Sequence, residues 1–253
     1  MNSKERFSNR VEDYVKYRPG YPREAIDYLY EEGGLSAESV AADIGAGTGI
    51  FSRYLLERGT KVIGVEPNDR MRGAAEEALS GFPGFRAVPG SAEATGLPGA
   101  YVDFIVSAQA FHWFDQAAAR REFARILKPG GKTALIWNVR LTSGTRFLEE
   151  YEDLLLKLGT DYADVNLRNV TREQLASFFR RGTMREARFT NRQIVDFDGL
   201  SGRLRSSSYA PAPGHPNHEP MMRELKALFD RNQQNGHVSL DYETTVYLGE
   251  MES

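Results

Sequence analysis

The chain has 253 residues, of which 41% are hydrophobic and 26% are charged, close to the averages of globular proteins. Its 32 Lys and Arg residues are balanced by 35 Asp and Glu residues, and the net charge of −3 does not indicate a polyanion-binding protein. The absence of cysteine excludes disulfides, thiolate nucleophiles and Cys-ligated zinc or iron–sulfur centres. The length fits one large domain, or one domain with an appended lobe.

The first predicted helix spans Phe7–Arg18, and the turn Arg18–Pro22 leads into a second helix near Arg23–Glu32. Met1–Arg10 is polar and charged, so it lacks the apolar core of a signal peptide. The longest apolar stretch, Phe104–Phe114, contains polar residues and is too short to cross a bilayer. We therefore expect a soluble, cytoplasmic protein without a membrane partner.

Between Val40 and Asn138, apolar runs of strand length alternate with helix-length segments, the pattern of a parallel sheet covered on both faces. Each run is almost continuously apolar, as expected of strands that are buried on both sides. The predicted strands are Ser39–Ile44, Lys61–Val65, Phe85–Val88, Val102–Ser107 and Thr133–Trp137. The sequence therefore predicts an α/β fold with a doubly wound sheet.

Two of the intervening helices have recognisable ends. Asn68 or Asp69 can cap a helix over Met71–Leu79, and Lys128-Pro-Gly-Gly131 can stop a helix over Gln116–Leu127. These boundaries define the segments that connect the predicted strands.

Further along the chain, Gly144–Leu158 has a helical pattern, and Thr171-Arg-Glu-Gln174 is a capping box that starts another helix. Arg185–Phe197 and His237–Leu248 alternate like strands, and we expect the second to be antiparallel and exposed on one face. Ser206–Pro220, rich in Ser, Pro, Gly and His, is interpreted as a lid or connection.

The strongest chemical pattern is an apolar strand that ends in Asp43 and is followed by glycines at positions 45, 47 and 49. Such a loop lets a ligand approach the backbone and points a helix N-terminus at it, although an ordinary tight turn without a ligand would have the same residues. A dinucleotide site needs its third glycine at position 50, which is Ile. Glu66 ends the second strand about 20 residues later, where an acid can bind a ribose diol in either cofactor class.

The segment Asp43-Ile-Gly-Ala-Gly-Thr-Gly49, together with Glu66, resembles the S-adenosylmethionine (SAM) site of class I methyltransferases. The resemblance covers about residues 5–140 and includes Ser91-Ala-Glu93, Gln109-Ala-Phe-His-Trp113 and Leu127-Lys-Pro-Gly-Gly131. The "type 11" branch, similar to trans-aconitate methyltransferase and its relatives, is indicated by Phe7, Tyr14, Arg18-Pro-Gly-Tyr-Pro22 and Phe111-His-Trp-Phe-Asp115.

The resemblance implies a Rossmann-like, seven-stranded, mostly parallel sheet in the order 3-2-1-4-5-7-6, with strand 7 antiparallel and with helical N-terminal and C-terminal cap elements. Arg185–Phe197 would be strand 6 and His237–Leu248 strand 7. It also implies one methyltransferase domain over residues 1–253. A helical lid would cover 1–34, the SAM-binding core 35–140, and the substrate-cap insertion with the last two strands 141–253.

The same resemblance implies roles for particular residues. Asp43 and the glycine loop would face the amino-acid end of SAM, Glu66 would bind the ribose, and Gln109 would lie under the sulfonium. The segment at Ala92 and Glu93 would flank the adenine. The expected cofactor-binding residues are Tyr14, Arg18, Asp43, Gly45, Ala46, Gly47, Gly49, Glu66, Pro67, Ala92, Glu93 and Gln109. Tyr14 and Arg18 would close the pocket from the N-terminal helix, although Arg18 could also be an exposed helix-end residue.

Other residues have two interpretations. His112 is the one candidate catalytic base, but it could instead pack beside Trp113 and orient the loop. Trp113 and Tyr21 could line a substrate pocket or belong to the core. His215-x-x-His218-Glu219 has metal-binding residue types without helical spacing, so we expect no metal there. Gly130-Gly-Lys-Thr133 imitates a phosphate loop but is followed by an apolar strand, which excludes a triphosphate site.

The leading hypothesis is a SAM-dependent methyltransferase that acts on a small molecule, with a carboxylate as one candidate acceptor. Arg140, Arg146, Arg203 and Arg205 would suit an anionic acceptor but could equally form a solvated basic surface. The alternatives are a nicotinamide-dependent oxidoreductase and a module that binds SAM without transfer. No Asn-Pro-Pro-Tyr-like element follows the fourth strand, so we expect no nucleic-acid substrate. The sequence makes no prediction of the oligomeric state.

Overall fold

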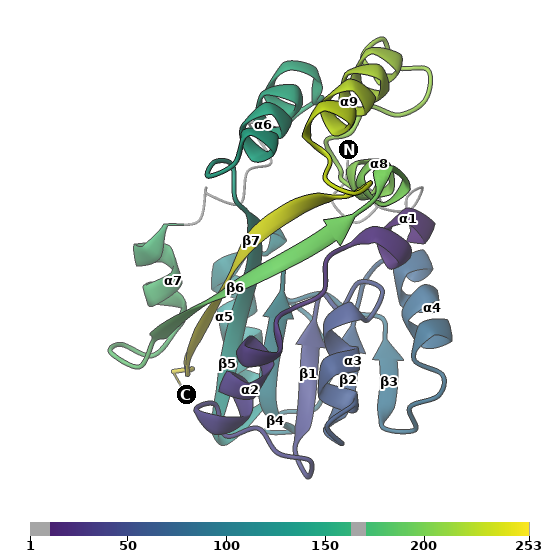
Figure 1. The fold of residues 1–253 in the computed structure, drawn as a ribbon. Helices are drawn as coiled ribbons and strands as arrows, with labels where there is room; N and C mark the ends of the chain where they lie inside the picture. Colours follow the sequence, from purple (N-terminus) through teal and green to yellow (C-terminus); the bar gives the residue numbers. More distant parts are fainter. Residues whose placement is uncertain (1–10, 163–170, 253) are drawn as a thin grey trace.

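A seven-stranded sheet in the order β3-β2-β1-β4-β5-β7-β6 runs through the centre of the protein (Figure 1). The computed structural model describes residues 11–162 and 171–252, apart from the side chains of Val11 and Tyr14. The strands are β1 (Val40–Ile44), β2 (Lys61–Val65), β3 (Phe85–Val88), β4 (Val102–Ala108), β5 (Leu127–Arg140), β6 (Arg185–Val195) and β7 (Val238–Glu250). β1 to β5 pair in parallel, whereas β7 is antiparallel to both β5 and β6. The predicted strand order and the antiparallel seventh strand are confirmed.

Helices cover both faces of the parallel part of the sheet, because alternate strand residues point to opposite sides. Ala41 of β1 packs on one face with α2 (Arg23–Glu31) and α3 (Ile50–Leu56). Ala42, the next residue, packs on the other face with α5 (Gln116–Ile126) and α7 (Arg172–Phe178). The domain is therefore doubly wound, as predicted. The other helices of the described residues are α1 (Val11–Tyr17), α4 (Asp69–Ala78), α6 (Arg146–Leu158), α8 (Phe197–Arg205), α9 (His218–Asn232) and the short 3₁₀ helix η2 (Phe111–Trp113).

The segment after β5 forms a cap with a hydrophobic cluster of its own. α6 and α9 lie side by side above the sheet, next to α8 and the start of β7 (Figure 1). Buried residues such as Leu155, Leu204 and Leu225 join these three helices. α1 packs on α8, where Tyr17 donates a hydrogen bond to Asp198 over 2.7 Å. The cap and the N-terminal helix thus meet on the same side of the sheet.

The capping predictions are confirmed at two helices. Asn68, and not Asp69, caps α4, since its side-chain oxygen accepts hydrogen bonds from the N–H groups of Arg70 and Met71. Thr171 and Gln174 form the reciprocal capping box that starts α7. At both helix starts the capping hydrogen bonds come from side chains within three residues of the first helical residue.

Helices α8 and α9 were absent from the sequence prediction. α8 contains two glycines, which lower helix propensity, but Asp196 caps it, and β6 therefore ends at Val195 instead of Phe197. Gly202 is required because a Cβ there would lie 2.3 Å from the ring of Tyr17. In α9, Pro220 falls in the first turn, where its missing N–H has no helical partner to lose. The predicted loop Ser206–Pro220 is therefore shorter than expected, because α9 begins within it at His218.

Two expectations about strands were wrong. β5 begins at Leu127, six residues before the predicted Thr133, because Leu127 pairs with Val102 ahead of a register shift in the β4–β5 ladder. The exposed face expected of the last strand belongs to β6 instead, where five residues are exposed along the strand. β7 lies between β5 and β6, so both of its edges are paired and none of its residues is exposed.

Among the described residues, no helix combines the length and the apolar character needed to span a lipid bilayer. Phe7 and Met1–Arg10, which were included in the sequence predictions, lie outside the described residues.

The packing of α5 provides a test of the fold. Phe123 is fully buried, and its ring meets Phe178 of α7 edge-on at 5.4 Å between centroids. We expect Phe123→Ala to lower the free energy of unfolding by about 3–5 kcal/mol, since it removes a large core side chain. Urea denaturation measures this change. Arg121→Ala, at an exposed position of the same helix, should stay within about 0.5 kcal/mol of the wild type.

Candidate active site

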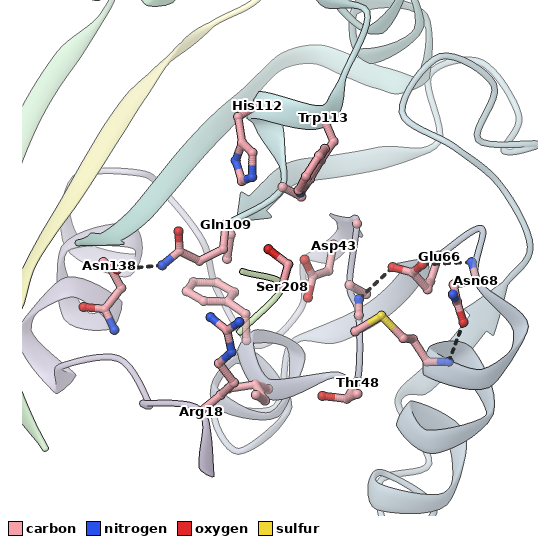
Figure 2. Close-up of a pocket in the computed structure, with 18 of the residues that line it drawn as sticks. Arg18, Asp43, Thr48, Glu66, Asn68, Gln109, His112, Trp113, Asn138 and Ser208 are labelled. Carbon is pink, nitrogen blue, oxygen red and sulfur yellow. Dashed lines mark hydrogen bonds between the residues drawn. The ribbon is translucent and has the colours of Figure 1, made fainter. Parts of the chain in front are cut away.

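A cavity of about 290 Å³ lies at the carboxyl ends of the parallel strands, the usual ligand position in an open α/β sheet. Figure 2 shows Arg18, Asp43, Gln109 and His112 around this open space. Of the expected cofactor-binding residues, ten line the cavity: Arg18, Asp43, Gly45, Ala46, Gly47, Glu66, Pro67, Ala92, Glu93 and Gln109. Gly49 does not, and the side chain of Tyr14 lies outside the described part of the chain.

The glycine loop adopts a backbone conformation that other residues rarely take. Gly45, Gly47 and Gly49 have φ angles of 75°, 57° and 79°. A Cβ at Gly45 would lie 2.5 Å from the Cβ of Ala110, and one at Gly49 would lie 2.6 Å from a methyl group of Leu79. Gly49 therefore allows α3 to pack against the end of α4, whereas Gly45 and Gly47 shape the cavity itself.

Asp43 is the penultimate residue of β1 and is 1% exposed. Its Oδ2 accepts a hydrogen bond from Ser52 over 2.7 Å, while its buried Oδ1 has no partner among the described residues. Burial raises the pKa of Asp43 to about 7; the charge of Glu66 acts in the same direction, and the Ser52 hydrogen bond opposes it. A donor on a bound molecule could satisfy Oδ1.

Glu66 directly follows β2 and connects the glycine loop to the next turn. Its Oε2 accepts from the N–H of Gly47 and its Oε1 from the N–H of Asn68, both over 2.9 Å (Figure 2). Burial raises the pKa of this carboxyl, although the two backbone N–H groups and Arg72 oppose the shift. Each carboxylate oxygen can accept a second hydrogen bond, so Glu66 can still bind a diol from the cavity.

The segment at Ala92 and Glu93 is fixed by a buried acid that the sequence analysis did not identify. Glu122 of α5 accepts hydrogen bonds from both the backbone N–H and the hydroxyl of Thr95. A hydrogen bond from Arg125 lowers the pKa of Glu122, and the hydrogen bonds from Thr95 act in the same direction. Burial opposes them, but the pKa still falls to about 2. In the sequence, nothing distinguished Glu122 on its predicted helix from an acid on the protein surface.

Gln109 follows β4 in an unusual conformation, with a φ of 59° that non-glycine residues rarely adopt. Its Nε2 donates to the carbonyl of Asn138 over 2.7 Å, and its buried Oε1 has no partner among the described residues. The strained backbone and the unsatisfied oxygen both occur beside the cavity, where such features commonly mark a functional site.

His112 lines the cavity, with its ring centroid 4.7 Å from that of Trp113. Burial lowers its pKa to about 4, so the imidazole is neutral and a weak base near pH 7. Its buried Nδ1 has no partner in the described part of the protein. These facts favour the packing interpretation over the base. Trp113 and Tyr21 both line the cavity, and Tyr21 also packs edge-on against Phe51.

The segment after α1 is tied to both the sheet and the cap. Arg18 donates to the carbonyl of Ser206 over 3.0 Å, so it is not an exposed helix-end arginine. The carbonyl of Gly20 accepts from Asn138 of β5 and from Asn191 of β6. This network closes one side of the cavity with residues far apart in the chain.

Several lining residues were missed by the sequence analysis. Thr48 was inside the recognised loop, and Asn138 follows the predicted fifth strand, so its place at the carboxyl edge could have been inferred. Met71, Tyr162 and Tyr209 gave no comparable indication, because they reach the cavity only through the packing of α4 and the cap. Within the described ranges, no group of three or more His, Cys, Asp or Glu side chains is placed to hold a metal ion.

Residues 42–135 match the sequence profile of a family described as a methyltransferase domain. An uncharacterized methyltransferase of Mycobacterium tuberculosis (strain H37Rv) is 42% identical over 134 residues, covering 53% of this chain and 52% of that protein. One from Schizosaccharomyces pombe is 34% identical over 152 residues, covering 60% and 59%. The chain thus spans about half the length of the curated relatives it matches.

Solved structures share the fold over most of the chain. A protein of Anaeromyxobacter dehalogenans, provisionally described as a type II methyltransferase, has a TM-score of 0.65 at 22% identity, over 92% of this chain and 98% of that one. A phosphoethanolamine N-methyltransferase of Haemonchus contortus, in complex with phosphomonomethylethanolamine and S-adenosylhomocysteine, has a TM-score of 0.58 at 15% identity, over 98% and 58%. At these identities the similarity shows the fold, with its 3-2-1-4-5-7-6 sheet.

The shape of the glycine loop can be tested by adding one methyl group. Gly45→Ala should lower the free energy of unfolding by about 2 kcal/mol or more, because the left-handed backbone costs roughly 1–2 kcal/mol and the new Cβ meets Ala110. Gly73→Ala, in α4 with open space around it, should be neutral or stabilise by up to about 1 kcal/mol. Equal unfolding free energies for the two variants would contradict the assigned loop geometry.

The raised pKa of Asp43 predicts a pH-dependent stability. The folded protein holds a proton on Asp43 more tightly than the unfolded chain does. The resulting stabilisation is fully present below about pH 4 and is lost as the pH rises through about 7. Relative to the wild type, Asp43→Asn should therefore gain about 2 kcal/mol of stability between pH 5.5 and 8.5, because the folded wild type keeps the extra proton over about 1.5 pH units of that range. Urea denaturation at both pH values measures the difference. Asp153→Asn, at an exposed position, should run parallel to the wild type.

Proposed function

We propose that this chain, which carries a methyltransferase domain of the class I fold, is a SAM-dependent methyltransferase that acts on a small-molecule acceptor. The observation that carries this proposal is the arrangement of Asp43 and Glu66 on either side of the glycine loop, at the carboxyl ends of adjacent strands. A SAM molecule offers an ammonium, a ribose diol and an adenine, and the cavity offers an acid for each of the first two. The residues present therefore fit this cofactor.

The unsatisfied atoms of the cavity support the same assignment. Asp43 Oδ1 and Gln109 Oε1 are buried acceptors without partners in the described protein, and SAM carries positive charge on its amino group and its sulfur. Glu66 would bind the ribose hydroxyls, and Ala92 and Glu93 would flank the adenine. When bound, SAM supplies an electrophilic methyl group. No residue of the chain needs to form a covalent bond with the substrate.

What the protein must do is hold donor and acceptor in line and keep water out, which can contribute up to ~7–11 kcal/mol. The Arg18–Ser206 contact and the Gly20 network close the cavity between lid and cap. His112 is too weak a base near pH 7 to remove a proton readily. An acceptor that is already ionised, such as a carboxylate, needs no base. We accordingly propose carboxylate O-methylation as the finer activity.

We also propose how the chain divides this work. Residues 1–34 would serve as a lid, 35–140 as the SAM-binding core, and 141–253 as a substrate cap together with the last two strands. The separate hydrophobic cluster of α6, α8 and α9 supports treating the cap as a unit that is laid over the core.

Binding of S-adenosylhomocysteine, measured by calorimetric titration, tests the proposed function. We expect Glu66→Ala to weaken this binding about 10- to 100-fold, since a hydrogen bond to a charged group contributes roughly 1.5–3 kcal/mol. Glu76→Ala, at an exposed position of α4, is the matched control and should bind like the wild type.

Two outcomes would contradict the proposal. One is a wild-type protein that does not bind S-adenosylhomocysteine. The other is a change in reduced-nicotinamide fluorescence on mixing, which would support an oxidoreductase. Ile50, which lines the cavity where a dinucleotide site has its third glycine, argues against that second outcome. Transfer from labelled SAM to a panel of carboxylates, amines and phenols separates an enzyme from a module that only binds.

A further inference from the structure

The wall of the cavity that the cap provides contains a buried arginine that has no acidic partner among residues 11–162 and 171–252. Arg203 of α8 is 8% exposed and lines the cavity. Its Nε donates to the hydroxyl of Tyr242 over 3.3 Å, and its Nη1 donates to the hydroxyl of Ser207 over 2.8 Å. Its Nη2 has no acceptor in the described part of the chain. No carboxylate of the described residues forms a salt bridge with this guanidinium.

The other three arginines that the sequence singled out do have acidic partners. Arg140 pairs with Glu152, and the guanidinium also lies 4.8 Å over the ring of Tyr151. Arg146 and Arg205 pair with Glu150 and Asp13, over 2.8 Å and 3.2 Å, in more exposed positions. The alternative of a solvated basic surface therefore applies best to Arg146, whose side chain is 71% exposed.

An arginine stays protonated in a protein, so Arg203 brings a permanent positive charge into the cavity wall. A buried charge that is hydrogen-bonded only to neutral hydroxyls is costly to maintain, and an anion of the right shape would repay that cost. The structure thus contains a cation whose natural counter-ion is not part of the described protein.

The electrostatics of a neighbouring group support this description. Tyr209 lines the same cavity, and burial alone would raise its pKa. The positive charges of Arg203, Arg18 and Arg140, with a hydrogen bond to Ser207, instead lower the pKa of Tyr209 below its usual value. The cap side of the cavity therefore has a positive potential, whereas the acids Asp43 and Glu66 lie at the ends of β1 and β2.

We propose that Arg203 binds a carboxylate of the methyl acceptor and is the residue that selects an anionic substrate. This inference rests on the proposed function, because it assigns the acceptor's end of the same cavity. The planar guanidinium favours a carboxylate, to which it can donate through Nη2 and a second nitrogen. The hydroxyls of Tyr242 and Ser207 hold the guanidinium in place meanwhile. Arg203 is thus a binding and specificity residue.

The test compares small carboxylates with their uncharged amides. Benzoate, phenylacetate and succinate are titrated calorimetrically against benzamide, phenylacetamide and succinamide, in the presence of S-adenosylhomocysteine. The wild type should bind at least one carboxylate tenfold or more tightly than its amide. Arg203→Met should weaken binding of that carboxylate at least tenfold, while its affinity for S-adenosylhomocysteine should stay within twofold of the wild-type value.

Arg205→Met is the matched control, since Arg205 lies on the same helix but pairs with Asp13, and it should keep the carboxylate preference. Because Arg203→Met removes a buried charge and could fail to fold, Arg203→Lys provides a second variant. It keeps the charge but loses the planar fork, and should bind the carboxylate several-fold more weakly than the wild type.

The inference is overturned if no carboxylate of the panel binds the wild type better than its amide, or if Arg203→Met retains the preference. Failure of the proposed function is distinguishable, because it would appear as a wild type that does not bind S-adenosylhomocysteine at all. Intact cofactor-product binding without carboxylate preference would reject the role of Arg203 alone.

Discussion

The two hydrogen bonds that Glu66 accepts from the N–H groups of Gly47 and Asn68 are the interaction on which the site depends. They join the glycine loop after β1 to the turn after β2, and Asn68 in turn caps α4. A buried acid is costly, and here the cost is offset by the two backbone N–H groups that donate to it. The acid therefore fixes the loop before any ligand binds.

The antiparallel end of the sheet supplies the second half of the cavity. β7 lies between β5 and β6, which extends the sheet and brings Asn138 and Asn191 together at the carbonyl of Gly20. Asn138 also accepts a hydrogen bond from Thr244 of β7 and, through its own carbonyl, one from Gln109. Buried polar networks of this kind hold their members in one arrangement. The segment after α1 and the strands β5, β6 and β7 consequently meet at a single strand end.

Much of the core could be predicted because its determinants are local. An apolar run, an acid at its end and three glycines are contiguous in sequence, and Asn68 and Thr171 act within three residues of their helix starts. The cap was harder, since α8 forms despite two glycines and is stabilised by packing against Tyr17 of α1, about 180 positions away. For the same reason the sequence pattern alone did not distinguish Arg203 from the other three arginines proposed for an anionic acceptor. Whether an arginine has an acidic partner depends on which chain segments fold beside it.

The distribution of charge in the cavity follows from this division of the chain. The core contributes acids, Asp43 and Glu66, because carboxylates at the ends of parallel strands can be satisfied by the N–H groups of the following loop and helix. The cap contributes Arg203 of α8, which lines the same cavity, and no salt bridge joins Arg203 to either acid. Charges of opposite sign that line one cavity without forming a salt bridge with each other attract ligands of opposite sign to its two sides. A cationic donor and an anionic acceptor would then lie in a fixed order, and the low dielectric between them would favour a reaction in which both charges disappear.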